Sequence, residues 1–204
     1  MRVIKEDRML PPMKESRKFD PKSLDKLNDP SRLVTQNPDL IWDTLTLADP
    51  HVLVDIGAGT GFFSARFARR LDKGRVYACD IQDEMLTWMK EHLPSDLQNK
   101  LIPLKMTEKT VPLPDGIADL VFMINLHHEL EDRQAMMREA YRLLKKGGVL
   151  MIIDWKKEET PEGPPLVIRV TEEDIISDMR SGGFTNIKMH RVLQYHTFVV
   201  GERP

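Results

Sequence analysis

The sequence predicts a doubly wound α/β fold in which a mostly parallel sheet of seven strands is covered by helices on both faces. From residue 51 onward, short apolar runs alternate with helical patterns, which is typical of parallel strands joined by crossover helices. A glycine-rich turn follows the first apolar run, at the place where such folds bind ligands. The last two predicted strands alternate apolar and polar residues, so we expect a C-terminal antiparallel hairpin.

The predicted strands follow one another at short intervals. They cover residues 51–56, 75–80, 100–105, 118–124, 149–154, 184–191 and 195–201. Strand 149–154 is almost continuously apolar, as a central parallel strand should be.

Helices are predicted over residues 60–72, 82–92 and 131–145, and from Thr171 to Ser181. Thr171 is a good N-cap because acidic residues fill the first turn after it. The pair Gly147-Gly148 is expected to stop the helix over 131–145, and Gly182-Gly183 to close the last helix.

Residues 1–48 form a separate N-terminal segment in this interpretation, packed on a main domain over residues 49–204. Its first 30 or so residues are rich in charge and proline, and Pro11-Pro12 and Pro21 break any long element. Residues 31–47 are expected to form one or two short helices interrupted by Pro38.

Composition narrows the class of protein. The chain has 204 residues, a mass of 23.6 kDa and a formal net charge of -2, so no basic excess favours a nucleic-acid partner. The one cysteine, Cys79, forms no intramolecular disulfide and no cysteine metal cluster. No run approaches the roughly 18 apolar residues of a membrane span, and the charged N-terminus lacks an apolar signal core. We therefore expect a cytoplasmic protein.

The segment from Val52 to Ser64 reads as a buried strand, a glycine turn and a helix start. Asp55 stands two residues before the first of three glycines, at 57, 59 and 61, and Phe62 follows. A dinucleotide fingerprint needs its third glycine one place later, where backbone approaches a pyrophosphate. The phenyl ring there and the carboxylate on the strand favour a ligand without phosphates that carries a cationic amino group. This combination favours S-adenosylmethionine over a nicotinamide or flavin cofactor.

A second acid, Asp80, ends the predicted strand over 75–80, about twenty residues beyond the glycines. Neighbouring strands of a doubly wound sheet place their carboxyl ends at one edge, so Asp80 is expected beside the glycine turn. A carboxylate there accepts both ribose hydroxyls of a nucleoside.

These motifs resemble the class I S-adenosylmethionine-dependent methyltransferases, in their small stand-alone form. The later landmarks are Val76 to Met85, Pro112 to Asp115 leading into Ala118 to Phe122, and Leu143 to Leu150. The resemblance runs from about residue 50 to the C-terminus. It implies a Rossmann-like fold, transfer of a methyl group to a small molecule by in-line displacement, S-adenosylhomocysteine as the product, and an N-terminal segment lying over the substrate mouth.

The resemblance and the strand ends together give the expected cofactor-binding residues. Asp55 would hold the methionine amino group, and Ile81 and Met85 would cover the adenine, although helix–sheet packing is an alternative for those two. The turn after the third strand has Met106 where the family often has an acidic or polar side chain, so Thr107 or backbone groups would supply the polarity. The full set is Asp55, Gly57, Ala58, Gly59, Gly61, Asp80, Ile81, Met85, Met106, Thr107 and Asn125.

Two adjacent histidines, His127 and His128, follow the predicted strand over 118–124 and are the candidate catalytic residues. An imidazole titrates near neutral pH and can hold or deprotonate a substrate; the alternative is packing and capping at the start of the next helix. Adjacent histidines lack the i, i+4 spacing of a helical metal site, so we expect no bound metal. Trp155, after the fifth strand, can wall a substrate pocket.

Other functions remain open at this point. A non-catalytic S-adenosylmethionine-binding regulatory protein would retain the same pocket. A protein or RNA methyltransferase would need an added recognition domain or a basic face, neither of which the sequence suggests. A metalloid acceptor such as arsenite would call for several thiolates, and Cys79 is alone. The acceptor atom and the oligomeric state are not encoded in these patterns.

Overall fold

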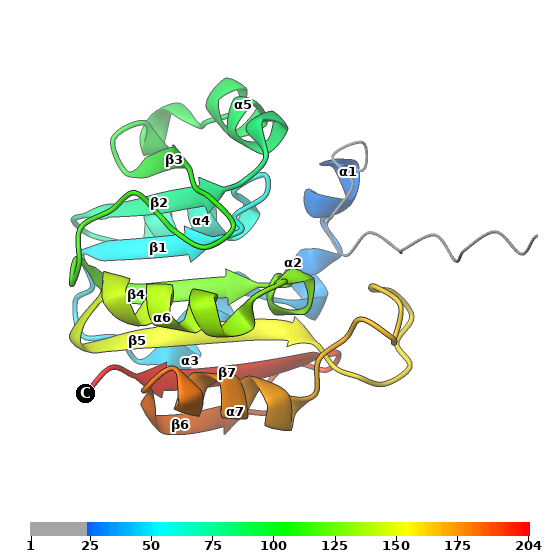
Figure 1. Cartoon of the computed structure of the whole chain (residues 1–204). Helices are drawn as coiled ribbons and strands as arrows, with labels where there is room; N and C mark the ends of the chain where they lie inside the picture. Colours follow the sequence, from blue (N-terminus) through cyan, green and yellow to red (C-terminus); the bar gives the residue numbers. More distant parts are fainter. Residues whose placement is uncertain (1–23) are drawn as a thin grey trace, which may run out of the picture.

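A single seven-stranded sheet organises the described part of the chain, residues 24–204, in a computed structural model (Figure 1). The strand order is β3-β2-β1-β4-β5-β7-β6. The strands are β1 (Val52–Ile56), β2 (Arg75–Asp80), β3 (Leu101–Lys105), β4 (Ala118–Ile124), β5 (Leu144–Trp155), β6 (Thr185–His190) and β7 (His196–Glu202).

Strands β1 to β5 pair in parallel, and β7 runs antiparallel to both β5 and β6. The chain moves outward from β1 through β2 to β3, then crosses back to β4 on the other side of β1. The strand order therefore reverses between β1 and β4, which is where doubly wound sheets open a ligand crevice. The predicted fold class and the antiparallel C-terminal pair are confirmed.

Helices cover both faces of the sheet because side chains alternate along the buried strands. Leu53, on one face of β1, belongs to a core shared with α3, α4 and α5. Val54, on the other face, belongs to a core shared with α6 and α7. The helices are α3 (Pro38–Leu45), α4 (Phe62–Arg70), α5 (Asp83–Glu91), α6 (Arg133–Leu143) and α7 (Glu172–Ser181), with short 3-10 turns η2 (Ser95–Leu97) and η3 (His127–Glu129).

The start of β5 corrects the sequence prediction. Gly147-Gly148 was expected to stop the preceding helix, but α6 already ends at Leu143 and the glycines lie inside β5. Gly147 has a φ of +74°, its N–H donates to the carbonyl of Arg203, and the Arg203 N–H donates to the carbonyl of Gly148. The glycines therefore form an irregular part of the strand, held by the C-terminal segment, and the β4–β5 register shifts there.

The last helix, α7, begins and ends where the sequence predicts. The Thr171 side chain accepts a hydrogen bond from the Asp174 N–H and caps α7. The helix closes at Gly182, and Gly183 has a φ of +93°.

Between residue 24 and the first strand, the structure has three short helices: α1 (Leu24–Leu27), α2 (Arg32–Thr35) and α3. Pro38 begins α3 rather than interrupting a helix, because Asn37 caps it by accepting hydrogen bonds from two backbone N–H groups. Ile41 and Leu45 of α3 are buried in the first core. In Figure 1, α1 and α2 lie beyond the carboxyl ends of the strands. The prolines predicted to break structure, Pro11-Pro12 and Pro21, lie outside the described residues.

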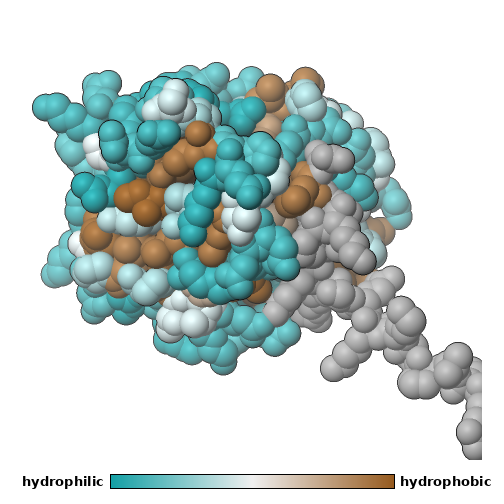
Figure 2. All heavy atoms as spheres, turned by 90° about the horizontal axis from the view of Figure 1, so that it is seen from above, coloured by the Kyte–Doolittle hydropathy of each residue, from teal (hydrophilic) through white to brown (hydrophobic). Residues whose placement is uncertain are grey.

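The surface agrees with a composition that is 30% charged. On the face seen in Figure 2, hydrophilic residues predominate and hydrophobic residues show between them in patches. None of the helices in residues 24–204 has the length and apolar content that a bilayer crossing demands.

Candidate functional site

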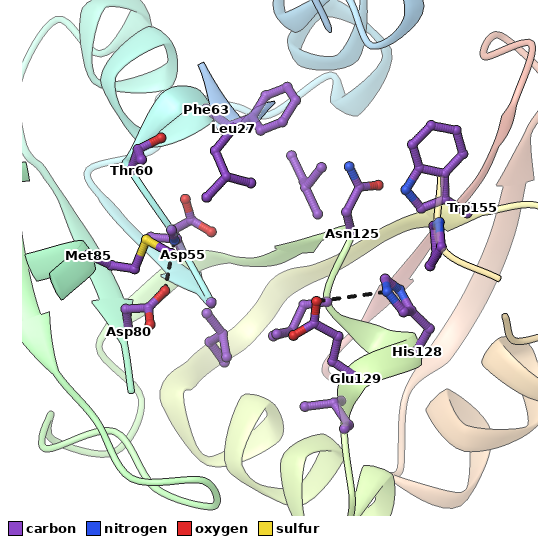
Figure 3. A pocket seen from close by; sticks show the side chains of 18 of the residues that line it. Leu27, Asp55, Thr60, Phe63, Asp80, Met85, Asn125, His128, Glu129 and Trp155 are labelled. Carbon is purple, nitrogen blue, oxygen red and sulfur yellow. Dashed lines mark hydrogen bonds and ion pairs between the residues drawn. The ribbon is translucent and has the colours of Figure 1, made fainter. Parts of the chain in front are cut away.

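A cavity of about 990 Å³ opens at the carboxyl edge of the sheet, at the point where the strand order reverses (Figure 3). Its wall comes from the glycine turn after β1, the ends of β2, β4 and β5, the helices α1 and α2, and the loop before α7. This volume lies at the upper end of the roughly 300–1,000 Å³ range of ligand pockets. The cavity is therefore large enough for a nucleoside cofactor and a second small molecule.

The glycine turn has a backbone that side chains rarely adopt. Gly57, Gly59 and Gly61 have φ values of +72°, +56° and +75°. At Gly57 a Cβ would also stand 2.6 Å from Cδ1 of Leu126. The N–H groups of Gly57 and Ala58 donate to the Cys79 carbonyl, 2.9 Å each, which ties the turn to β2.

Asp55 is the last residue but one of β1, with only 3% of its surface exposed. Its Oδ2 accepts a hydrogen bond of 2.5 Å from the Ser64 hydroxyl of α4. Burial raises the pKa of Asp55 to about 7; the Ser64 hydrogen bond opposes this shift, and the nearby charge of Asp80 adds to it. A cationic ligand in the cavity would stabilise the carboxylate form that burial disfavours.

Asp80 ends β2 and lines the same cavity, 7% exposed. Its two oxygens accept backbone N–H groups of Gly59, at 2.8 Å, and Gln82, at 2.9 Å. Burial raises the pKa of Asp80, against the lowering effect of these N–H donors. Each carboxylate oxygen retains a second lone pair for a ligand hydroxyl. The two acids predicted to converge therefore line one cavity, and their charges interact.

Most of the residues that were expected near the adenine lie in the cavity wall. Ile81, Met85 and Met106 line the cavity, together with Glu108 and Lys109, which the sequence reasoning did not select. Thr107 is not among the lining residues; its hydroxyl instead bonds to the Thr110 hydroxyl at 2.7 Å and closes its own turn.

Gly61 also lies outside the cavity wall. It is the N-cap residue of α4, and a Cβ there would stand 3.0 Å from the sulfur of Met89. The positive φ of Gly61 therefore serves the turn and the packing of α4 against α5.

Asn125 follows β4 with a φ of +59°, lines the cavity and bonds to the residue that follows α2. Its side-chain amide forms a reciprocal pair with buried Gln36: Gln36 Nε2 donates to Asn125 Oδ1 at 3.1 Å, and Asn125 Nδ2 donates to Gln36 Oε1 at 3.0 Å. This pair fixes the segment after α2 over the end of β4.

The two histidines point to different environments. His127 is fully buried outside the cavity wall, with Nε2 3.0 Å from Oδ2 of Asp178 in α7. His128 lines the cavity, and its Nδ1 lies 2.7 Å from Oδ1 of Asp154, which is 1% exposed.

The surroundings of His128 set its charge. Burial disfavours the imidazolium, but the hydrogen bond and the charge of Asp154 outweigh burial, so the pKa of His128 is raised. Glu129 Oε1 lies 3.8 Å from its Nε2 (Figure 3). His128 is thus a more basic imidazole than usual at the wall of the cavity.

Some lining residues carry no sequence signal. Arg32 begins the short helix α2 and Gln36 follows it, in a part of the sequence without a motif, and the segment 162–168 is an irregular loop. Arg169 holds this loop by donating hydrogen bonds to carbonyls of Lys156, Glu158 and Pro164. Trp155 lines the cavity beside it.

Residues 24–204 contain no group of three or more His, Cys, Asp or Glu side chains arranged to hold a metal ion. Burial raises the pKa of the Cys79 thiol, so this cysteine is held as the neutral thiol.

Comparisons with known proteins give the family. A family model described as a methyltransferase domain matches residues 54–152. The crystal structure of a SAM-dependent methyltransferase from Aquifex aeolicus is 32% identical, covers 92% of this chain and 100% of that chain, and superposes with a TM-score of 0.86. A phosphoethanolamine N-methyltransferase from Haemonchus contortus, in complex with S-adenosyl-L-methionine, shares the fold at 14% identity, with a TM-score of 0.70 over 83% of this chain and 52% of that one.

Among curated proteins, the ubiquinone/menaquinone biosynthesis C-methyltransferase UbiE of Neisseria meningitidis is 29% identical over 128 residues. The alignment covers 59% of this chain and 51% of the relative. The chain thus spans about half the length of the curated relatives it matches.

The residues of the cavity fit the cofactor of this family. Asp80 and the glycine turn form the side suited to a nucleoside, buried Asp55 offers a carboxylate to a cationic group, and the volume exceeds what one nucleoside needs. The shared fold, the identity to the Aquifex enzyme over nearly the whole chain and this fit agree. The chain belongs to the S-adenosylmethionine-dependent methyltransferases, enzymes that use S-adenosylmethionine as their cofactor.

Proposed function

We propose that this enzyme methylates a small, flat acceptor, such as a quinol or another enolic ring, whose nucleophile must lose a proton. The observation that carries the proposal is the basic imidazole of His128 at the far side of the cavity from Asp55 and Asp80. Figure 3 shows the two acids on one side and His128 and Trp155 on the other, with Asn125 between them.

The apolar side chains of the cavity wall support a flat apolar acceptor. Leu27, Phe63, Trp155 and Ile168 line the cavity with apolar surface. The chain has no basic excess that would favour a nucleic acid. The name of the curated relatives, which refers to ubiquinone and menaquinone, also makes quinols the first compounds to test.

The chemistry required of the protein is limited. The bound cofactor supplies a methyl group activated by its sulfonium. The enzyme excludes water, aligns the acceptor and takes its proton as the nucleophile attacks. In this proposal the proton moves to Nε2 of His128, while Asp154, as a positioning residue, holds Nδ1 and stabilises the imidazolium that forms.

The test is transfer of a labelled methyl group into a panel of phenols, quinols, amines, RNA and protein. A quinol or phenol is expected to accept the label, and transfer only to RNA, protein or tertiary amines would refute the proposal. His128→Gln should lower kcat/KM by on the order of 100- to 10,000-fold, the usual contribution of a general base.

The dependence of the rate on pH distinguishes a general-base role of His128 from a structural role. The wild-type rate should rise with pH through the pKa of His128, because the imidazolium below that pKa cannot take a proton. His128→Gln should lose this rising limb of the pH profile. His127→Gln, beside Asp178, is the matched control and should lower thermal stability while keeping the limb. Retention of the limb in His128→Gln would contradict the assignment.

A further inference from the structure

A second hollow lies between α4 and α5, outside the cavity that takes the cofactor. We call it the α4–α5 pocket; its lining residues include Arg66 and Arg69 of α4, Trp88 and Met89 of α5, and His92 just after α5. Its volume is about 170 Å³, well below the roughly 300 Å³ at which pockets for drug-sized ligands begin. The α4–α5 pocket is therefore of a size for a small ligand.

The inner wall of this pocket is apolar. Phe62, Met89 and Leu101 line it and are buried. The indole of Trp88 stacks on the imidazole of His92, with ring centres 4.2 Å apart and planes at 10° to each other. Flat, apolar surfaces of this kind bind aromatic rings.

The charged groups of the α4–α5 pocket are basic. No Asp or Glu of residues 24–204 lines it. In the wall of the cofactor cavity, by contrast, acids such as Asp55, Asp80 and Glu129 outnumber the lysines and arginines. The two pockets therefore suit ligands of opposite charge, and the smaller one favours an anion.

Arg66 is the arginine of this pocket that has no carboxylate within hydrogen-bond reach in the described part of the chain. Its guanidinium lies 3.6 Å from the ring centre of Phe62, and its Nη1 donates to the Phe62 carbonyl at 2.7 Å. Arg69 instead pairs with Asp96 at 3.0 Å. An arginine has five N–H donors, so most of those of Arg66 remain for a ligand.

The charge of Arg69 also acts on Arg66. Burial lowers the pKa of Arg66, the nearby charge of Arg69 lowers it further, and Asp39 opposes the shift. A ligand anion would offset the repulsion between the two arginines. A planar guanidinium matches a carboxylate with two parallel hydrogen bonds, which favours a carboxylate over other anions.

We propose that the α4–α5 pocket binds a small aromatic carboxylate and that its occupancy changes the affinity for the cofactor. The carboxylate lies on Arg66 and the ring packs against Met89 and Leu101. The effect on the cofactor follows from a shared wall, because Thr60 lines both pockets. Next to it, a Cβ at Gly61 would stand 3.0 Å from the sulfur of Met89. Both ligands therefore act on the same glycine turn, and the effect of each on the other's affinity is reciprocal.

Calorimetric titrations of three probes into the wild type and Arg66→Gln test the site. Benzoate has the ring and the carboxylate, benzyl alcohol has the ring without the charge, and inorganic phosphate has the charge without the ring. The wild type should bind benzoate on the order of 10- to 100-fold more tightly than benzyl alcohol, the gain expected for charge-assisted hydrogen bonds. Phosphate should bind more weakly than benzoate. Arg66→Gln should lose the preference for benzoate and keep its affinity for benzyl alcohol.

Arg70→Gln is the matched control. Arg70 lies on the same helix but pairs with Asp39 and Asp43 and does not line the α4–α5 pocket. This variant should bind benzoate like the wild type. Arg66→Lys should keep part of the preference for benzoate, because the charge remains.

A second titration measures the coupling to the cofactor site. S-adenosylhomocysteine is titrated into the wild type and into Arg66→Gln, each with and without saturating benzoate. In the wild type, benzoate should change the Kd of S-adenosylhomocysteine about 5-fold or more, the lower end of typical allosteric coupling. In Arg66→Gln the Kd should stay the same.

Four results would overturn the proposal. Equal wild-type affinity for benzoate and benzyl alcohol would remove the anion site, and phosphate binding as tightly as benzoate would remove the role of the ring. A preference for benzoate that persists in Arg66→Gln would place benzoate elsewhere. An unchanged Kd of S-adenosylhomocysteine in the wild type would remove the coupling. Failure of the proposed acceptor chemistry would change none of these titrations, because Arg66, Met89 and Leu101 do not line the cofactor cavity.

Discussion

Two buried acids from neighbouring strands face the same cavity, yet their surroundings differ. Asp80 accepts two backbone N–H groups, which stabilise its charge, whereas Asp55 accepts the Ser64 hydroxyl. Burial is the largest influence on both, and it brings the pKa of Asp55 to about 7. Asp55 is therefore the acid whose charge depends on a cation in the cavity, while Asp80 is held by the fold itself.

The pKa of Asp55 predicts a pH dependence of stability in the cofactor-free protein. In the unfolded chain this group titrates near ~3.9. The protonated carboxyl group therefore makes its full contribution to the free energy of unfolding below about pH 4. As the pH rises, this contribution falls by up to about 1.4 kcal/mol per pH unit, and the fall ends above the folded pKa. Urea denaturation of the wild type and Asp55→Asn between pH 4 and 8 measures this. A constant difference between the two proteins would contradict the prediction.

At the scale of elements, the site depends on turns with positive φ that bring backbone close to neighbouring side chains. Gly57 and Gly147 have nearly the same φ, +72° and +74°. A Cβ at Gly57 would meet Leu126, whereas a Cβ at Gly147 would meet nothing within 4 Å. Alanine substitutions at the two glycines therefore distinguish the free-energy cost of the backbone conformation from the cost of the contact with Leu126.

Gly147→Ala should destabilise the protein by about 1–2 kcal/mol, the cost of a left-handed conformation. Gly57→Ala should cost about 1–3 kcal/mol more, because Leu126 must move. Since Leu126 lines the cavity, Gly57→Ala should also weaken cofactor binding. Denaturant unfolding and calorimetry measure both effects; equal destabilisation by the two substitutions would show that the contact with Leu126 costs nothing.

The amide pair between Gln36 and Asn125 joins two elements that are 89 positions apart in the chain. Asn125→Gly removes the amide while glycine accepts the φ of +59° without strain. In a double-mutant cycle with Gln36→Ala, we expect a coupling of about 1 kcal/mol. Hydrogen exchange of the helices over 24–45 should quicken equally in either single variant. Strict additivity of the two substitutions would mean that the pair contributes nothing.

At the scale of the whole molecule, the reversal of strand order decides where the site lies. Residues from β1, β2, β4 and β5 reach one cavity because the parallel strands end at one edge, and the N-terminal helices close it from outside. Ligand binding therefore couples the sheet to segments from both halves of the chain.

Cofactor binding is expected to stabilise this whole arrangement. At 100 times its dissociation constant, S-adenosylmethionine should raise the free energy of unfolding by about 2.7 kcal/mol. For a chain of this size, this corresponds to an increase in Tm of about 5–10 °C. Thermal scans with S-adenosylmethionine, S-adenosylhomocysteine and NAD measure it. Stabilisation by NAD instead of the sulfur nucleosides would contradict the site described.

Local patterns in the sequence were sufficient to predict the sheet and to predict that Asp55, Asp80 and most of the glycine turn line one cavity. Strand and helix periods follow from which residues are buried, and a glycine turn between an acid and a helix is a contiguous motif. The spacing of Asp80 follows from the length of a helix crossover. These features depend on neighbouring residues, so Asp55, Asp80 and most of the turn lie where the pattern predicted.

Only the tertiary structure decided which side chains share the cavity. His127 and His128 are adjacent in the chain, but in the 3-10 turn η3 successive side chains point about 120° apart, so that one lines the cavity and the other packs on α7. Thr107 and Gly61 serve their own turns, while Arg32 and Gln36 enter from a segment with no motif. Contacts between distant segments depend on how whole elements pack, and no local period or spacing encodes that.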